Sequence, residues 1–275
     1  MHLLFTSDCQ CGIAYYKDGG KGKEGKPQRI YNGKKTQEHQ YPWLVYLFVE
    51  RYQTNETECG TKEPGFGWKL RVRCSGSLIS NKHVLTNAHC FQRDNFRFNY
   101  TTDRAYIVYG LYWTCSGLDR CEDPEGNENR GIKEVRKYFL HPKYTVEDDN
   151  YDVAIIKIKG KITFSAAVRP ICLPNNKNEK DTYIKKVLTV TGYGSVNTVV
   201  GIDKDECTKQ KETILKDKGA SHAHEAHMLV QKCPKKSETK RRNGKNRICM
   251  QGHLEPRKIC KGDSGSPAFL EENHR

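Results

Sequence analysis

The sequence lacks any run of 18 apolar residues, and its longest apolar stretch, Trp43–Val49, has only the length of a strand. A bilayer-spanning helix is therefore excluded, and we expect no membrane partner. Internal repeats, a collagen-like period and low-complexity tracts are also missing, which excludes fibrous and repeat architectures. Residues 1–5 are too few for the apolar core of a signal peptide. We therefore expect that the natural start lies upstream or that the chain is a fragment.

The composition of the 275 residues is that of a folded chain with room for one or two domains. Hydrophobic residues make up 36%, which is low for a globular protein but well above the level of a disordered one. The formal net charge is +14. Because no nucleic-acid-binding motif accompanies that charge, we expect no nucleic-acid partner.

Cysteine is abundant: twelve are spread along the chain. An even, scattered set indicates disulfides formed in an oxidising compartment. The alternative, a zinc site, requires C-x2-C units, whereas the closest pair, Cys9 and Cys11, is separated by a single residue. Two glycosylation sequons, at Asn55 and Asn99, fit the same conclusion. We therefore expect a secreted, disulfide-bonded glycoprotein.

Short apolar runs separated by Gly, Pro and Asn predict an all-β protein. The expected strands are Trp43–Val49, Leu70–Ile79, Ala105–Tyr109, Val153–Ile158 and Val187–Thr191. One short helix is expected over His222–Gln231, ended by Pro234. Residues 17–28, rich in Lys, Gly and Asp, are typical of an exposed linker.

Two clusters, one of Lys and Arg and one of His, are candidates for ligand binding. Lys232–Arg247 holds eight basic residues against one acidic residue, which suits a heparin-like polyanion, although a solvated loop is the favoured interpretation. His224 and His227 would share one face of the expected helix. The spacing differs from the H-E-x-x-H metal motif, so we expect a surface helix and no metal.

Three segments together carry residues for acyl transfer. They are Leu85–Cys90 with His89, Asn150–Ile155 with Asp152, and Cys260–Pro267 with Ser264. A serine hydroxyl needs a base within hydrogen-bond reach, and histidine titrates in the right range. A buried carboxylate fixes the imidazole tautomer. The amides of Gly262 and Ser264 could stabilise a developing oxyanion.

These segments, with five further motifs, resemble the chymotrypsin-like (trypsin-fold, S1) serine proteases. The further motifs are Arg29–Gly33, Tyr41–Trp43, Cys74–Ile79, Arg169–Pro174 and Thr191–Gly194. The resemblance implies two antiparallel β-barrels, expected over 30–165 and 166–275, with the catalytic site between them. It also implies that His89 is the general base, Asp152 its orienting carboxylate and Ser264 the nucleophile, with no cofactor.

The resemblance also implies a zymogen cut between Arg29 and Ile30. The new ammonium of Ile30 would pair with the carboxylate of Asp263 and thereby order the amide of Gly262, and a buried ion pair of this kind must be well matched. Residues 1–29 would then be a pro-segment, held by a bond from Cys9 or Cys11 to Cys172.

The resemblance pairs some of the cysteines. It implies Cys74–Cys90 and Cys233–Cys249, while Cys115 and Cys121 are close enough in sequence to bridge locally. Four cysteines stay unassigned: Cys59, Cys207, Cys260 and one of Cys9 or Cys11.

The sequence departs from the family pattern at two important places. It stops eleven residues after Ser264, so we expect a chain truncated at the C-terminus and an incomplete second barrel with an unpaired edge. Lys258 stands where the family lines the floor of its specificity pocket. A cation there predicts a preference for an acidic or neutral residue before the scissile bond. Asn87 and Ser266 replace small residues common in the family without removing a catalytic group.

The function expected is that of a secreted serine endopeptidase, activated at Arg29–Ile30 by another protease and acting on proteins or peptides. The alternative is a catalytically inactive homologue that binds partners, polyanions among them, through its basic surface. Neither function requires a cofactor or a metal.

Overall fold

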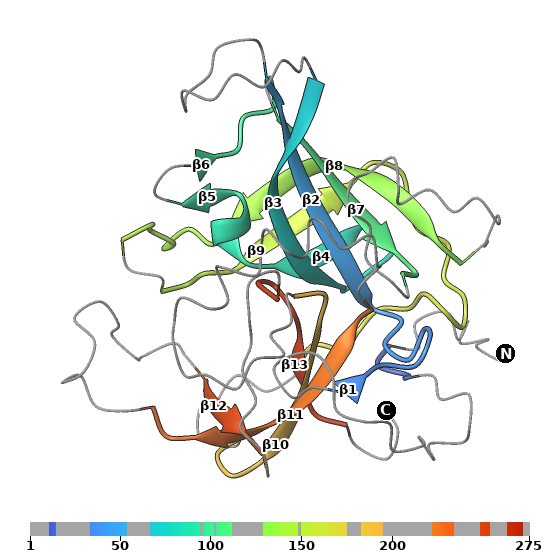
Figure 1. Cartoon of the computed structure of the whole chain (residues 1–275), viewed down its shortest axis with the longest axis vertical. Coiled ribbons are helices and arrows are strands. Elements are labelled where there is room, and N and C mark those ends of the chain that lie inside the picture. The colour runs from blue at the N-terminus through green and yellow to red at the C-terminus, as the bar shows by residue number, and fades with distance from the viewer. Residues whose placement is uncertain are drawn as a thin grey trace, which may run out of the picture.

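The computed structural model describes a molecule built almost wholly of antiparallel strands (Figure 1). The residues that it describes are 11–14, 34–53, 67–93, 96–101, 103–111, 129–147, 150–174, 183–194, 222–233, 248–253 and 263–271. Within these ranges no helix is long and apolar enough to cross a membrane.

Six strands form a closed barrel in the order β2-β3-β4-β9-β8-β7. Their bounds are β2 Leu44–Gln53, β3 Gly67–Leu78, β4 His83–Thr86, β7 Asp103–Tyr109, β8 Gly131–Leu140 and β9 Ala154–Ile158. A one-turn 3-10 helix, η1 (Ala88–Cys90), follows β4, and a small hairpin of β5 (Gln92–Arg93) and β6 (Phe96–Arg97) follows η1. The barrel has no free edge, because β2 pairs with both β3 and β7.

The apolar run at 43–49 becomes the centre of the core. Every residue of this run is buried, because one face of β2 fills the barrel and the other faces the rest of the molecule. On the second face, the rings of Tyr46 and Tyr193 lie 5.2 Å apart. The continuous apolar character of the run therefore reflects burial on both sides.

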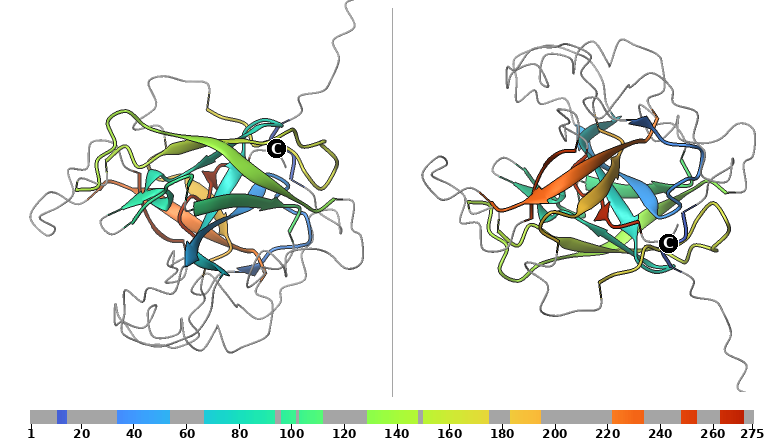
Figure 2. Two further views of the ribbon diagram at one scale, coloured as in Figure 1. Left: turned by 90° about the horizontal axis from the view of Figure 1, so that it is seen from above. Right: turned by 90° about the horizontal axis from the view of Figure 1, so that it is seen from below.

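A second, five-stranded sheet lies beside the barrel (Figures 1 and 2). Its main path is β1-β11-β10-β13, and β12 pairs with β11. The bounds are β1 Lys34–Lys35, β10 Val187–Gly192, β11 His224–Gln231, β12 Cys249–Gly252 and β13 Ala268–Phe269. Phe269 of β13 packs edge-on against Trp43, which immediately precedes β2, with ring centroids 5.1 Å apart, and so joins sheet to barrel.

All five expected strands are present, and the all-β class with a barrel and a second sheet is confirmed. The expected helix over 222–231 is wrong: residues 224–231 form β11. Ala226, Met228 and Val230 alternate on the buried face, while His227 and Gln231 point outward, which is the period of a strand. Pairing of β11 with β1, β10 and β12 outweighs the helix preference of Ala, Glu and Met.

Three disulfides lie in the described residues: Cys11–Cys172, Cys74–Cys90 and Cys233–Cys249. Each is a pair that the resemblance implies, and the first selects Cys11 over Cys9 as the partner of Cys172. Cys115 and Cys121 lie outside the described residues, as do Cys59, Cys207 and Cys260.

Candidate functional site

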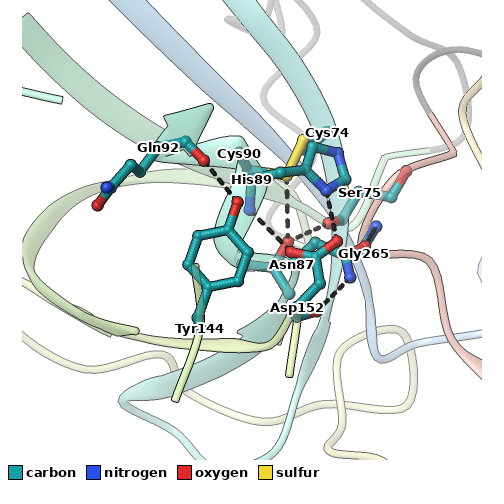
Figure 3. The surroundings of a disulfide bond; sticks show 10 residues. Cys74, Ser75, Asn87, His89, Cys90, Gln92, Tyr144, Asp152 and Gly265 are labelled. Atoms are coloured by element: carbon teal, nitrogen blue, oxygen red, sulfur yellow. Dashed lines mark hydrogen bonds and ion pairs between the residues drawn. A yellow bond between two sulfur atoms is a disulfide. The ribbon is translucent and has the colours of Figure 1, made fainter. Parts of the chain in front are cut away.

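His89 is fixed by the two residues that flank it in η1. Ala88 and Cys90 are fully buried, whereas the side chain of His89 is 30% exposed. The disulfide to Cys74 ties η1 to β3 directly behind the imidazole (Figure 3). The ring is therefore presented at the barrel surface by a backbone that is anchored on both sides.

Asp152 reaches His89 from the loop that precedes β9. Its Oδ2 lies 2.7 Å from Nδ1 of the ring, and its Oδ1 accepts a hydrogen bond of 2.9 Å from the main-chain N–H of His89. A carboxylate at Nδ1 favours the tautomer with its proton there, which leaves Nε2 as the basic nitrogen. This arrangement orients an imidazole for general-base chemistry.

The segment of Ser264 is attached to the same wall of the barrel through its backbone. The carbonyl oxygen of Ser264 accepts a hydrogen bond of 2.7 Å from the amide of Ser75 in β3. The next residue, Gly265, has φ +84°, and a Cβ there would collide with the carbonyl oxygen of Ser75 and with Oγ1 of Thr86. Gly265 is thus required where this loop meets the barrel.

Asp263, the residue before Ser264, is buried. Its Oδ1 accepts a hydrogen bond of 2.7 Å from the amide of Gly194. Side chains at Gly192 or Gly194 would collide with this carboxyl group, so the two glycines create its space. Burial raises the pKa of the neighbouring Tyr46 to about 12, opposed by Arg73 and reinforced by Asp263. The phenol therefore stays neutral beside the carboxylate.

Several predicted site residues lie outside the described residues: Arg29, Ile30, Asn55, Lys258, Gly262 and residues 234–247 of the basic segment. Asn99 is described. It is exposed, and its Oδ1 accepts hydrogen bonds from the amide and the hydroxyl of Thr101, the third residue of the sequon. The side chain is thus accessible on the surface.

The geometry does not favour a metal centre at the histidine cluster. His224 is buried and His227 is exposed, on opposite faces of β11 rather than on one face of a helix. In the part of the chain that the structure describes, one group has metal-like spacing: Cys74, His89 and Cys90. Both sulfurs of that group are joined in the disulfide, so they are not thiolate ligands.

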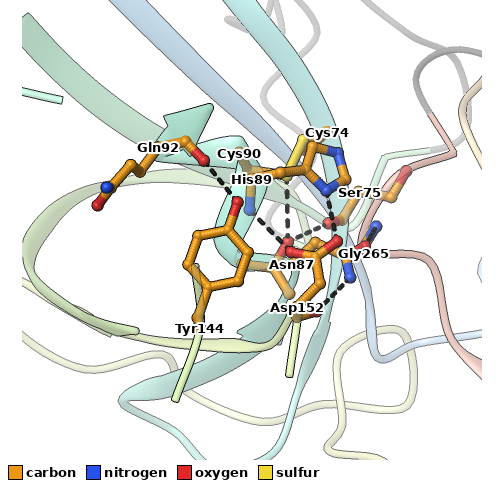
Figure 4. A network of polar contacts seen from close by, with 10 residues as sticks. Cys74, Ser75, Asn87, His89, Cys90, Gln92, Tyr144, Asp152 and Gly265 are labelled. Atoms are coloured by element: carbon orange, nitrogen blue, oxygen red, sulfur yellow. Dashed lines mark hydrogen bonds and ion pairs between the residues drawn. A yellow bond between two sulfur atoms is a disulfide. The ribbon is translucent and has the colours of Figure 1, made fainter. Parts of the chain in front are cut away.

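The polar network contains one participant that sequence analysis did not assign to the site. Asn87 donates a 2.6 Å hydrogen bond from Nδ2 to the carbonyl oxygen of Asp152, and its Oδ1 accepts one from the amide of Gly265 (Figure 4). The only signal in the sequence is a polar residue where relatives commonly have a small one. Both partners are distant in sequence, so the contacts follow from the fold alone.

Comparison with known proteins agrees with this geometry. The family model described as Trypsin matches residues 30–274. The chain is 27% identical over 256 residues to CLIP domain-containing serine protease B15 of Anopheles gambiae, and 25% identical over 256 residues to phenoloxidase-activating factor 1 of Holotrichia diomphalia. It is 23% identical over 245 residues to coagulation factor XI of Bos taurus.

These alignments cover 91%, 91% and 89% of the chain, in the order given. They cover 60%, 60% and 32% of the three relatives, so the chain spans less than two thirds of the length of each. The family match extends over nearly the whole chain and includes every segment that builds the site described above. The chain belongs to the trypsin family of serine proteases.

Proposed function

We propose that the protein is a serine endopeptidase in which Ser264 is the nucleophile, His89 the general base and Asp152 the orienting carboxylate. The observation that carries the proposal is the pair of hydrogen bonds that Asp152 makes, one to the ring and one to the main chain of His89. It leaves Nε2 of His89 as the nitrogen that accepts a proton. The carbonyl oxygen of Ser264 accepts a hydrogen bond from Ser75 in β3, and the adjacent Cys74 is joined by a disulfide to Cys90, the residue after His89. This shared attachment to β3 supports the assignment of the nucleophile.

The reaction follows the chemistry of these groups. Nε2 of His89 takes the proton of Ser264 Oγ while the oxygen attacks the peptide carbonyl carbon. The amides of Gly262 and Ser264 stabilise the resulting oxyanion. The imidazolium then gives its proton to the leaving amine, and an acyl-enzyme remains. Water, deprotonated by His89, attacks the ester, and the proton returns to Ser264 as the acid is released.

Activation by a cut at Arg29–Ile30 is part of the proposal, with residues 1–29 as the pro-segment. The surroundings of Asp263 support it. Its carboxyl group is buried against Gly192 and Gly194 and accepts a hydrogen bond from the amide of Gly194. An ammonium brought next to this buried group would form a charge pair with it. Asp263 directly precedes Ser264, so a charge pair at Asp263 would also fix the position of the nucleophile.

The relatives indicate the setting of this activity. Two of their names refer to coagulation and to phenoloxidase activation. We infer that the substrates are proteins, that another protease activates this one, and that the protein is secreted and carries glycans at its sequons. Lys258, by the resemblance, faces the residue before the scissile bond and selects acidic or neutral side chains there.

The deciding experiment is active-site labelling with a fluorophosphonate probe. The protein is cut at Arg29–Ile30, verified by N-terminal sequencing, and incubated with the probe beside a matched Ser264→Ala variant. Covalent labelling of the wild type alone, mapped to Ser264, is the expected result. A correctly cut wild type that stays unlabelled would overturn the proposal and favour the inactive homologue that binds partners.

A further inference from the structure

Asn87 occupies the N-cap position of η1 but does not cap it. Its backbone is extended, with φ −87° and ψ 148°, and its side chain makes no hydrogen bond to the helix. Asparagine at an N-cap normally accepts a hydrogen bond from an amide in the first turn. Here the side-chain amide makes its hydrogen bonds to other segments of the chain instead of to η1.

The side chain joins two segments that approach His89 from different parts of the chain. Nδ2 donates 2.6 Å to the carbonyl oxygen of Asp152, and Oδ1 accepts from the amide of Gly265 (Figure 4). These partners lie 65 and 178 residues away in sequence. The orientation of the side chain follows from its partners, because a carbonyl oxygen can only accept and a backbone N–H can only donate.

We propose that Asn87 is a positioning residue that holds the segments of Asp152 and Ser264 in register on either side of His89. The proposal rests on the serine protease function proposed above. Asn87 immediately precedes the buried Ala88 that anchors η1, so its own backbone is fixed relative to the imidazole. One short, planar side chain therefore connects η1, which carries His89, to the main chain of Asp152 and to that of Gly265, the residue after Ser264.

The residue type follows from the two contacts. Asp152 supplies an acceptor and Gly265 a donor, so the bridging group must carry a donor and an acceptor side by side, as an amide does with its nitrogen and oxygen on one carbon. A carboxylate at this position would keep the contact to Gly265 but would repel the carbonyl oxygen of Asp152. An alanine would remove both contacts and leave the main chain of η1 unchanged.

Such a bridge does not touch the substrate; it affects the rate by fixing the relative positions of the catalytic groups. Reactive groups must be held close to their attack geometry, and a displacement of about 1 Å can cost about a hundredfold in rate. For a bridge with two hydrogen bonds and other anchors nearby, we expect removal to slow acylation about tenfold. The effect would fall on acylation rather than on general stability.

The test compares the wild type with Asn87→Ala and Asn87→Asp, each cut at Arg29–Ile30. Inactivation by diisopropyl fluorophosphate transfers a phosphoryl group to Ser264 Oγ with loss of fluoride, so its rate constant measures how readily Ser264 attacks an electrophile with help from His89. Amide hydrogen exchange at Gly265, followed in glycine labelled with nitrogen-15, measures the bridge directly. Asn81→Ala is the matched control, because Asn81 is exposed in the turn between β3 and β4. It should react and exchange like the wild type.

In Asn87→Ala we expect inactivation about tenfold slower and faster exchange at Gly265. In Asn87→Asp the exchange should stay slow, because a carboxylate still accepts from Gly265, while inactivation remains impaired. Wild-type rates and wild-type exchange in Asn87→Ala would overturn the proposal. If the wild type itself does not react, the serine protease function fails separately. Exchange at Gly265 then decides the bridge alone: faster exchange in Asn87→Ala supports it and unchanged exchange refutes it.

Discussion

Asp152 binds His89 twice, through Oδ1 to the main-chain amide at 2.9 Å and through Oδ2 to Nδ1 of the ring at 2.7 Å. In Asp152→Asn, an amide NH2 facing Nδ1 would force that nitrogen to accept, which moves the ring proton to Nε2. We expect inactivation by diisopropyl fluorophosphate to slow by about 10⁴-fold, the cost of such a tautomer change in triads of this kind. An unchanged thermal unfolding midpoint would show that the fold survives. Undiminished reactivity would refute the role of Asp152.

Gly265 and Gly160 form a matched pair, because both have positive φ, +84° and +71°. A Cβ at Gly265 would collide with Ser75 and Thr86, whereas at Gly160 nothing lies within 4 Å. We expect Gly160→Ala to lose about 1 kcal/mol of unfolding free energy from backbone strain alone. Gly265→Ala should lose clearly more and should abolish labelling of Ser264. Urea denaturation measures both; equal losses would mean that the packing of Gly265 against β3 is unimportant.

The disulfides Cys74–Cys90 and Cys233–Cys249 each link residues 16 apart. Replacing either pair by alanine should therefore release a similar constraint on the unfolded chain, about 3 kcal/mol. Only Cys74–Cys90 anchors η1, so its loss should also slow labelling of Ser264, while loss of Cys233–Cys249 should not. Urea denaturation and labelling of both variants test this. Equal labelling would show that η1 does not need its covalent anchor.

Glu225 is a buried carboxyl group whose Oε2 accepts from the hydroxyl of Tyr41 at 2.5 Å and from Nε2 of Gln40 at 3.0 Å. Burial is the main cause that raises the pKa of Glu225 above its ordinary value of 4.5, with the hydrogen bond from Tyr41 opposing and Glu271 adding to it. The folded state then binds the proton more readily than the unfolded state. Stability contributed by this group consequently falls as the pH rises above 4.5.

Glu225→Gln removes that titration and keeps the shape of the side chain. We expect the variant to unfold at a higher temperature than the wild type at neutral pH, with the difference disappearing below a pH of 4.5. Glu134→Gln is the control, because Glu134 is half-exposed and paired with Lys159. Thermal unfolding across the pH range measures both. A difference for Glu225→Gln that does not change with pH would contradict the assignment.

Lys258 provides a test of substrate selection. If it lines the pocket as the resemblance implies, Lys258→Asp should reverse the charge that meets the substrate and favour cleavage after Lys or Arg. Profiling of wild type and variant on a peptide library measures this, and Lys261→Asp controls for a general change in charge. A wild type that already cleaves after Lys or Arg would refute the proposed preference.

Sequence reasoning succeeded where apolar patterning was uninterrupted. The strands at Leu44–Gln53 and Ala154–Ile158 follow from unbroken apolar or alternating runs. The sequence analysis did not predict β8, Gly131–Leu140, because five of its residues are either charged or tyrosine. In addition, a register shift between Val135 and Lys137 breaks the alternation of the strand. It also assigned a helix to β11, where composition favoured helix and pairing decided otherwise.

For the site, the motifs predicted which residues matter but not how they are held. The contact between His89 and Asp152 joins segments 63 residues apart, and a family resemblance suffices to expect it. The bridge at Asn87 depends on the approach of two further segments, and no local pattern encodes that approach. Long-range polar contacts of this kind require the fold before they can be found.

The Cys11–Cys172 disulfide crosses from the segment before Arg29 to the segment before β10. A cut after Arg29 would therefore sever the backbone without separating the two pieces. On a gel run without reductant, the cut and uncut molecules would migrate together, and only a thiol reagent would split them into a light and a heavy chain. Any surface formed by the light chain would accompany the enzyme to its target.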